Sequence, residues 1–453
     1  MIYQAQPPLE FIPPTLNPLF LRLVHLSLPS WMRWKTAIAN VEADNVETLV
    51  DLYRQFQDGK IRFMIAFRHP KTDDPFCLAY LLSQLVPKVA QPSTILKSPI
   101  HAHFIYDRGI PLWAGSHVGW IAANLGATPI QRGKADWTGL RSARELFLNG
   151  NFPMAAAPEG ATNGLSEFIS PLEPGIAQLS FWCAEDLHSR DRPEKVLIVP
   201  VGIKYSYVEE PWNAIAVLLS QLEFASGLSV GESNSSFESL YPRLLNLAEH
   251  LMSLMEQFYT RFYHQKLPDI KIVEAGDRNE ALANRLEAML NIILQVPEQY
   301  FDLRPLGNLT DRCRRVEQAG WNCIFREEFK DRIALSAVEK GLGDRIAEEA
   351  NLRLWHMRLV ESFVAVTVKY IQQKPTCERF AETTLLLSDM VTRIGGNNPF
   401  NRPQLGKQRA KITIGEPISV SERYSTYKQS RQTARQSVAE LTSDLQQALE
   451  KLI

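Results

Sequence analysis

The chain has 453 residues, enough for two or three domains of ordinary size. Its 49 lysine and arginine residues nearly balance its 50 aspartate and glutamate residues, so the formal net charge is −1. A nucleic-acid-binding protein normally carries a basic excess, so this balance argues against nucleic acid as a partner. Hydrophobic residues make up 45% of the chain, a proportion typical of globular proteins that bury a core.

Cysteine usage and hydropathy indicate a reducing compartment and no membrane-spanning segment. The five cysteines are scattered, without the short paired spacings of a disulfide framework or a zinc site. The first residues lack the basic region and apolar core of a signal peptide, and no apolar run is long enough for a transmembrane helix. We therefore expect a cytoplasmic protein that is not integral to a membrane but can lie on its surface.

Residues 1–35 are expected to form an N-terminal amphipathic segment that is rich in leucine. Trp31 and Trp34 stand beside Arg33 and Lys35, and tryptophans next to cations suit the boundary between lipid headgroups and acyl chains. The alternative is a helix that packs on the protein core with both tryptophans buried. The sequence alone favours neither interpretation.

Residues 36–209 show strand and helix patterns in alternation. The expected strands are residues 61–67, 102–106, 127–130, 152–157 and 196–203, and the expected helices are residues 46–57, 76–85, 113–125, 138–149 and 175–187. Such alternation predicts an α/β fold in which a mostly parallel sheet is covered by helices on both faces. The near-continuous apolar run of residues 196–203 suits a central strand of such a sheet.

The character of the chain changes to a helical insertion over residues 210–405. Apolar residues recur there at helical spacing, and strand patterns are nearly absent. The expected helices span about residues 240–262, 282–293, 335–371 and 378–394. Residues 406–453 return to the α/β domain with a closing strand and a C-terminal helix.

One strand-to-helix turn carries residues suited to acid–base chemistry. His69 follows the strand of residues 61–67, and Asp74 stands five positions later, before Pro75. Open α/β sheets place their chemistry at such turns. An imidazole can take a proton from a hydroxyl, and a carboxylate can hold the ring and stabilise its charged form. Alternatively, Asp74 is a helix N-cap with proline at the first helical position, and His69 is an ordinary loop histidine.

Four short blocks, in order and each at a strand end, resemble those of the glycerolipid acyltransferases, the superfamily of glycerol-3-phosphate and lysophosphatidate (1-acyl-sn-glycerol-3-phosphate) acyltransferases. They are His69-x-x-x-x-Asp74, the strand ending in Arg132, Pro158-Glu-Gly160, and Ile198-Val-Pro-Val-Gly202. The similarity covers about residues 36–207 and 407–420, and it does not extend into the helical insertion.

The resemblance implies transfer of a fatty acyl chain from a thioester to a hydroxyl. His69 is then the general base, and Asp74 orients its ring. The acyl donor is acyl-CoA or acyl carrier protein as a co-substrate, and no other cofactor is implied. No covalent acyl-enzyme is needed, because the thioester is already activated. Backbone N–H groups at the start of the helix after Asp74 are candidates for stabilising the developing oxyanion.

The resemblance also implies substrate-binding residues. Arg132 resembles a phosphate-binding arginine, and a guanidinium offers a fork of donors that suits phosphate. Glu159 and Gly160 match the block where the family places acceptor-binding groups. Pro200 matches the block thought to shape the acyl site.

Two departures from the family pattern bear on the acceptor. Arg68 stands where the family has asparagine, and Ala161 and Thr162 follow Gly160 where the family has threonine and arginine. The second departure removes one cation from the expected phosphate site. Either Arg68 and Lys71 replace that cation, or the acceptor is not a simple glycerol phosphate.

The sequence thus predicts an acyltransferase acting on a glycerol phosphate or lysophosphatidate-type acceptor at a membrane surface. The alternatives are an acyltransferase for a non-phosphorylated lipid alcohol, and a non-catalytic protein that binds lipid or acyl carrier protein. His101 and His103 share one face of a strand, but two histidines are an incomplete metal site, so we expect a structural role for them and no metal.

Overall fold

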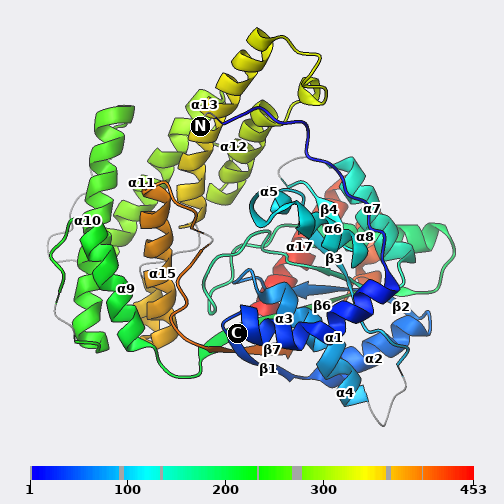
Figure 1. The fold of residues 1–453 in the computed structure, drawn as a ribbon. Helices are drawn as coiled ribbons and strands as arrows, with labels where there is room; N and C mark the ends of the chain where they lie inside the picture. Colours follow the sequence, from blue (N-terminus) through cyan, green and yellow to red (C-terminus); the bar gives the residue numbers. More distant parts are fainter. Residues whose placement is uncertain are drawn as a thin grey trace. The chain divides into compact units, whose positions relative to one another are not determined.

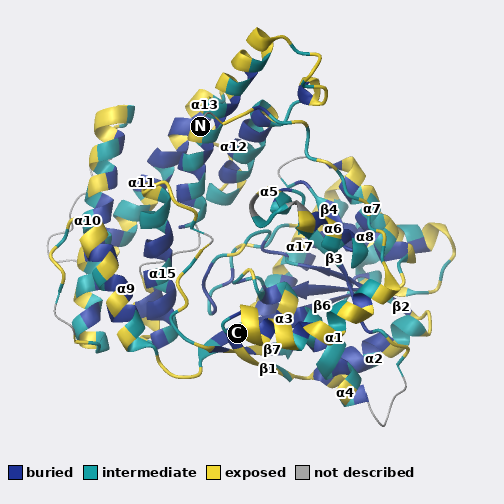
Figure 2. Cartoon of the chain, viewed as in Figure 1, coloured by how far each residue is buried: buried dark blue, intermediate teal, exposed yellow. Residues whose placement is uncertain are grey.

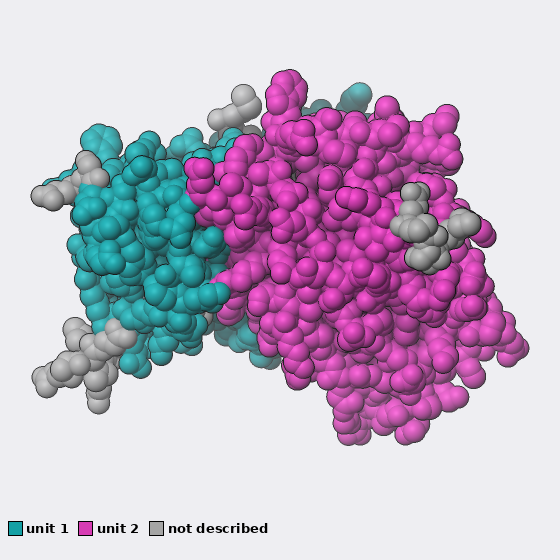
Figure 3. Space-filling model, turned by 90° about the horizontal axis from the view of Figure 1, so that it is seen from below, with its two compact units in different colours: residues 1–10, 132–134, 210–406 teal, residues 11–131, 135–209, 407–453 magenta. Residues whose placement is uncertain are grey.

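The computed structural model describes residues 3–90, 96–132, 136–231, 234–267, 278–363, 369–399 and 401–453. The chain divides into two compact units, which are coloured separately in Figure 3. The α/β unit comprises residues 11–131, 135–209 and 407–453. The helical unit comprises residues 1–10, 132–134 and 210–406, so its main segment lies within one residue of the insertion expected over residues 210–405.

The N-terminal residues do not form one segment with the helix that follows them. Residues 1–10 belong to the helical unit, where the N–H of Gln6 donates to the carbonyl of Ile324 at 2.8 Å. The N–H of Arg326 donates back to the carbonyl of Gln6 at 2.9 Å. The prediction of a single segment over residues 1–35 is therefore wrong, because its first part pairs with a distant part of the chain.

An eight-stranded sheet forms the centre of the α/β unit, in the order β1-β7-β6-β2-β5-β3-β4 with β8 beside β6. Its neighbouring strands run parallel, except that β6 is antiparallel to β7 and β8. The strands are β1 (Ile38–Asp44), β2 (Ile61–Phe67), β3 (His103–Asp107), β4 (Thr128–Ile130), β5 (Met154–Ala156), β6 (Lys195–Tyr207), β7 (Gln408–Ile414) and β8 (Ile418–Ser419).

Helices cover both faces of this sheet (Figure 1), which confirms the predicted fold class. Successive side chains of β2 alternate between two cores, with Phe63 and Ile65 in one and Met64 and Ala66 in the other. The first core includes α1 (Pro18–Lys35), α2 (Val46–Gln57), α3 (Asp74–Tyr80) and α4 (Val86–Ala90). The second includes α7 (Trp137–Asn149), α8 (Gly175–Ser189) and α17 (Arg431–Glu450). The unit also contains α5 (Ile110–Ala114), α6 (Ser116–Asn124) and α16 (Tyr424–Tyr427).

The described residues in the main segment of the helical unit carry seven α-helices, of which six have 14 residues or more. They are α9 (Trp212–Ala225), α10 (Phe237–Tyr263), α11 (Arg278–Tyr300), α12 (Leu309–Ile324), α13 (Ala337–Glu361), α14 (Lys369–Gln373) and α15 (Cys377–Ile394). The helix expected over about residues 335–371 corresponds to α13 and α14, and residues 364–368 between them lie outside the described residues. The large helical insertion is thus confirmed as part of the fold.

Some elements were not predicted from the sequence. Strand β1 lies at one edge of the sheet and buries only Ile38 and Val41, so its polar residues hide the strand pattern. Helix α12 is rich in charge, yet its start carries a capping box in which Asn308 and Asp311 each accept from the other's backbone. Such a pair of residues three positions apart is a sequence signal for a helix start, so the start of α12 can be predicted from the sequence.

Helix α1 packs on the α/β core with one face and exposes apolar residues on another (Figure 2). Leu21, Leu28 and Met32 are buried, whereas Leu26 is 80% and Trp34 84% exposed. The interpretation with both tryptophans buried is therefore wrong. Among the helices of the described ranges, none combines the length and the apolar character that crossing a bilayer requires.

Candidate active site

Strand β2 and helix α3 bring His69 and Asp74 together at the carboxyl end of β2. The strand is buried between β5 and β6, and the N–H of Arg68 extends its pairing by donating to the carbonyl of Val201 at 2.9 Å. The chain then turns, and Asp74 becomes the first residue of α3, followed by Pro75. Proline suits this position, because the first turn of a helix has no internal acceptor for its N–H.

The two predicted catalytic side chains are in direct contact. His69 Nδ1 lies 3.0 Å from Asp74 Oδ2, which also accepts the backbone N–H of Lys71 at 2.7 Å. The other oxygen, Oδ1, accepts a hydrogen bond from the Tyr205 hydroxyl. Both oxygens of this carboxylate are therefore satisfied within the turn and its neighbouring strand, so Asp74 does not act as the N-cap of α3.

This arrangement favours one of the two neutral tautomers of the imidazole. Asp74 is fully buried, whereas the His69 side chain is 21% exposed. A buried carboxylate that faces Nδ1 favours the tautomer with the proton on Nδ1. Nε2 then carries the lone pair, and it is the nitrogen that can accept a proton from a bound hydroxyl.

Tyr205 is the residue of this site that sequence reasoning missed. It lies in β6, and burial raises the pKa of its hydroxyl well above the ordinary value, with the Asp74 charge adding to the shift. The hydroxyl therefore stays protonated and donates to Asp74. The thiol of Cys77 lies 3.5 Å from the same hydroxyl, and burial raises its pKa too. Tyr205 belongs to no recognisable sequence motif. It lies four residues after Val201, which pairs with Phe67 of β2, so only the strand pairing brings it to the site.

Arg68 does not bind substrate, contrary to the prediction. Its side chain has no exposed surface, and its guanidinium donates to backbone carbonyls. One terminal nitrogen lies 2.7 Å from the carbonyl oxygen of Ser166, and the other lies 2.6 Å from that of Leu165 and also donates to that of Phe168. Arg68 therefore holds the loop of residues 165–168 against the end of β2.

Glu159 also acts inside the protein, so its assignment as an acceptor-binding group is wrong. One oxygen accepts the backbone N–H of His69 at 2.9 Å, and the other accepts the N–H of Ser170 at 3.0 Å. Burial raises the pKa of this carboxyl, and the charge of Arg68 opposes that shift. Gly160 has φ +71°, and a Cβ there would stand 2.3 Å from a carboxylate oxygen of Glu173. Glu159 therefore holds the backbone at His69, and Gly160 lets the loop after β5 lie close to Glu173. The predicted role of Gly160 in acceptor binding stays a prediction.

Two further residues predicted to bind substrate, Lys71 and Pro200, contact other parts of the α/β unit. The Lys71 ammonium donates to Gln408 and lies 4.3 Å from the centre of the Tyr205 ring. Pro200 is buried in β6 opposite Ala66, where its carbonyl accepts the N–H of Gly415. It is therefore part of the sheet, and its predicted contact with the acyl chain stays a prediction.

Arg132 belongs to the helical unit, although the sequence placed it in the α/β domain. There its charge acts on Glu361. Burial raises the pKa of that carboxyl, but the charges of four arginines together outweigh burial and lower it; they are, in order of effect, Arg314, Arg132, Arg358 and Arg393. A phosphate-binding role for Arg132 stays a prediction.

The predicted oxyanion donors at the start of α3 are already occupied. The N–H of Phe76 donates to the carbonyl of Asp73 at 3.0 Å, and the N–H of Cys77 donates to the same oxygen at 3.2 Å. Pro75 has no N–H to offer. The prediction that these groups stabilise an oxyanion is therefore wrong, because the tight first turn of the helix uses them.

His103, the first residue of β3, and His101, two residues before that strand, have structural contacts. His101 Nε2 lies 2.9 Å from the carbonyl oxygen of Leu125, and His103 Nδ1 lies 2.8 Å from that of Gly126. Both side chains are buried and support the end of the loop before β4. Across the part of the chain that the structure describes, no group of three or more histidine, cysteine or acidic side chains could hold a metal ion.

Buried His101 should make stability depend on pH. Burial lowers its pKa from 6.5 to about 3, so between these values the unfolded chain binds a proton that the folded protein does not. The free energy of unfolding should therefore fall as pH decreases below 6.5, by up to about 1.4 kcal/mol per pH unit from this residue. Urea unfolding at several pH values should show a shallower decline for His101→Gln. Equal slopes for both proteins would contradict this assignment.

Comparison of the chain with models of protein families, with curated proteins and with solved structures finds no match. The case for an activity therefore depends on the geometry around His69 and on the sequence blocks that resemble the glycerolipid acyltransferases.

Proposed function

We propose that the α/β unit is an O-acyltransferase that moves a fatty acyl chain from a thioester to the hydroxyl of a lipid precursor. The observation that carries this proposal is the chain of contacts from Tyr205 through Asp74 to His69, which leaves Nε2 of a partly exposed imidazole to accept a proton. The four sequence blocks support the same reaction.

In this proposal the reaction needs one direct displacement. Nε2 of His69 takes the proton of the acceptor hydroxyl while the oxygen attacks the thioester carbonyl carbon. The carbon–oxygen bond forms, the carbon–sulfur bond breaks, and the thiolate takes the proton back from the imidazolium. Asp74 stabilises the imidazolium during the reaction and holds the ring in place. General-base assistance of this kind typically contributes about a hundredfold to ten-thousandfold to the rate.

The surroundings of His69 support a non-phosphorylated lipid alcohol as a second candidate acceptor. Arg68 and Glu159 are buried in the scaffold, so two of the residues expected to bind a phosphorylated acceptor do not bind it. The leading acceptor remains a glycerol phosphate or lysophosphatidate, with Lys71 as the candidate cation within the α/β unit. The second is a non-phosphorylated lipid alcohol. Mass spectrometry of the ester formed with each acceptor, and with acyl-CoA or acyl carrier protein as donor, separates these cases.

Tyr205 is proposed as a positioning residue, and its removal should lower turnover. Tyr205→Phe deletes the hydroxyl that donates to Asp74, so we expect kcat to fall about tenfold while KM for the thioester stays unchanged. Tyr53→Phe is the matched control, because Tyr53 loses an equally buried hydrogen bond, 2.8 Å to the carbonyl of His101. A fall in kcat that is the same for both variants would show that Tyr205 acts only through stability.

We propose that α1 attaches the protein to the surface of a membrane. The helix has no acidic residue, and it exposes Leu19, Leu23, Leu26 and Trp34 to solvent. Trp31 packs its ring 4.6 Å from that of Phe76, which lies on α3 two residues after Asp74. A helix with exposed leucine and tryptophan beside basic residues suits the interface of an anionic bilayer. A lipid acceptor would then meet the enzyme close to His69.

Charge reversal on α1 tests this attachment. Arg33→Glu combined with Lys35→Glu should weaken binding to vesicles that contain anionic lipid, because each cation near such a surface contributes about 1 kcal/mol, or about 30-fold for both. The matched control reverses two exposed cations of α17, Arg431 and Arg435. Sedimentation that is equal for the α1 variant, the control and the unaltered protein would rule out this role for α1.

A further inference from the structure

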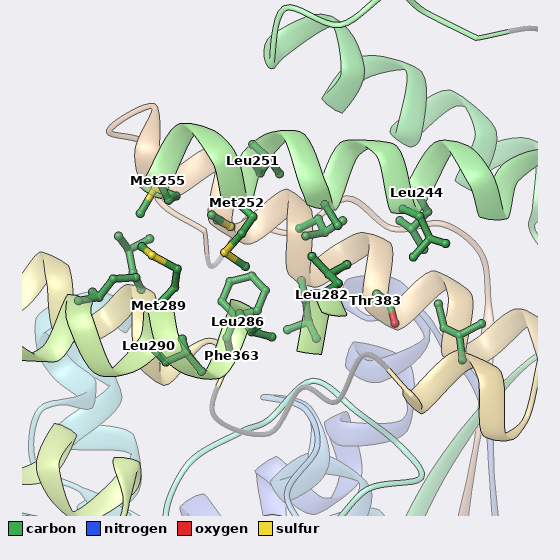
Figure 4. Close-up of a pocket in the computed structure, with 18 of the residues that line it drawn as sticks. Leu244, Leu251, Met252, Met255, Leu282, Leu286, Met289, Leu290, Phe363 and Thr383 are labelled. Carbon is green, nitrogen blue, oxygen red and sulfur yellow. The ribbon is translucent and has the colours of Figure 1, made fainter. Parts of the chain in front are cut away.

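The helical unit encloses an apolar cavity that the acyltransfer site does not use. It lies among α10, α11, α13 and α15, and Figure 4 shows side chains from these helices pointing into it. None of the residues that line it carries a charge, and leucine and methionine predominate. The space inside, including its open mouth, is about 980 Å³. The space inside that is open to the centre of a water-sized molecule is smaller, about 100 Å³.

The polar atoms at the wall of the cavity are already paired. The Tyr241 hydroxyl donates to Asn279 Oδ1 at 3.0 Å, and the Thr383 hydroxyl donates to the carbonyl of Arg379 at 2.9 Å. A polar group entering this space would lose its hydration without gaining a charged partner, which is costly. The part of a ligand that occupies the cavity must therefore be apolar.

The cavity is long, and its walls can adapt in shape. On α10 the lining residues run from Tyr241 to Met255, which is about 21 Å along a helix, and on α11 they run from Leu282 to Ile293, about 16 Å. Met252, Met255, Met289 and Met390 are unbranched and flexible, and such side chains fit apolar ligands of variable shape. These dimensions suit one extended alkyl chain better than a compact ring system.

We propose that this cavity binds a single long unbranched alkyl chain, supplied by a free fatty acid or by a fatty acyl thioester. The site belongs entirely to the helical unit, so its occupancy does not require the chemistry proposed for His69. It gives the helical insertion a function of its own, which is to hold a fatty chain.

A filling substitution tests the proposal on the full chain. Ala248→Phe puts a ring into the cavity, whereas Leu254→Phe adds the same ring on the exposed side of the same helix. Palmitate and palmitoyl-CoA are titrated separately, below their micelle concentrations, by displacement of a fluorescent fatty acid. We expect saturable binding by the unaltered protein and the Leu254 variant, and binding at least about tenfold weaker for the Ala248 variant. Circular dichroism and thermal melting check that each variant folds.

Comparison of the two ligands identifies the source of the chain. Similar affinities mean that the cavity recognises the chain alone, and binding of only one of them identifies that ligand as the source. Absence of saturable binding of both ligands by the unaltered protein, or full binding by a folded Ala248 variant, would overturn the proposal.

Photolabelling locates the chain even if the Ala248 variant does not fold. A palmitate analogue with a diazirine at the chain end should label peptides of α10 or α11 in the unaltered protein. Labels found only in the α/β unit would contradict the proposal. His69→Ala should keep this labelling while losing turnover, so failure of the binding proposal and failure of the proposed activity give different results.

Discussion

Replacement of His69 by alanine is expected to lower acceptor-dependent thiol release from an acyl thioester by about a hundredfold to ten-thousandfold. The reason is that, in the part of the chain that the structure describes, the other groups bonded to the Asp74 carboxylate are donors, namely the backbone N–H of Lys71 and the Tyr205 hydroxyl. The fold should persist, because the substitution removes one hydrogen bond at a partly exposed position, worth about 1 kcal/mol. The measurement is the steady-state rate of thiol release at saturating acceptor.

His188→Ala is the matched control for this result. His188 is exposed in the last turn of α8, which packs on the opposite face of the sheet from α3. Its loss should leave the rate unchanged within about twofold. An equal loss of rate in both variants, or undiminished thiol release by folded His69→Ala, would remove His69 from the reaction.

Replacement of Arg68 by methionine is expected to destabilise the protein by about 3 to 5 kcal/mol. The guanidinium is fully buried and satisfies the carbonyls of Leu165, Ser166 and Phe168. Its charge also offsets the burial of Glu159, whose pKa it lowers against the effect of desolvation. Methionine fills similar space but leaves those carbonyls, and a buried carboxylate, without their partner.

Chemical unfolding by urea, followed by circular dichroism, measures this loss. Arg141→Ala is the control: Arg141 is exposed on α7, and its removal should change the free energy of unfolding by less than about 0.5 kcal/mol. If Arg68 instead bound a substrate phosphate, Arg68→Met would raise KM for a phosphorylated acceptor and leave the unfolding midpoint unchanged. That outcome would restore the role predicted from the sequence.

Much of the α/β fold could be predicted because its strands are short apolar runs with helical patterns between them. The run of residues 196–203 identified β6, and the apolar residues after Lys60 identified β2. Strand β1 was missed because an edge strand needs few buried residues, and only Ile38 and Val41 mark it. These two residues are three positions apart, so β1 lacks the alternation that marks a half-buried strand.

The candidate site was predicted in part. Contacts between residues that are close in the sequence were predicted, whereas contacts that depend on strand pairing or on burial were not. His69 and Asp74 are five residues apart, so the local turn alone brings them together. Tyr205 lies 131 residues from Asp74, and only the pairing of β2 with β6 brings it there. The substrate role of Glu159 is predicted from its match to a family block, and that of Arg68 from the cation missing at the expected phosphate site. The sequence does not reveal that each has a buried backbone partner.

We propose that this protein joins a fatty acyl group to a hydroxyl, and the product of that reaction can be measured directly. The most direct measurement uses a deuterium-labelled acyl thioester, a panel of phosphorylated and non-phosphorylated lipid alcohols, and mass spectrometry of the lipid products. The proposed acyl transfer predicts a labelled ester with at least one acceptor, and the amount of ester should equal the amount of released thiol. Labelled fatty acid from hydrolysis alone, or an intact thioester with every acceptor, would contradict it.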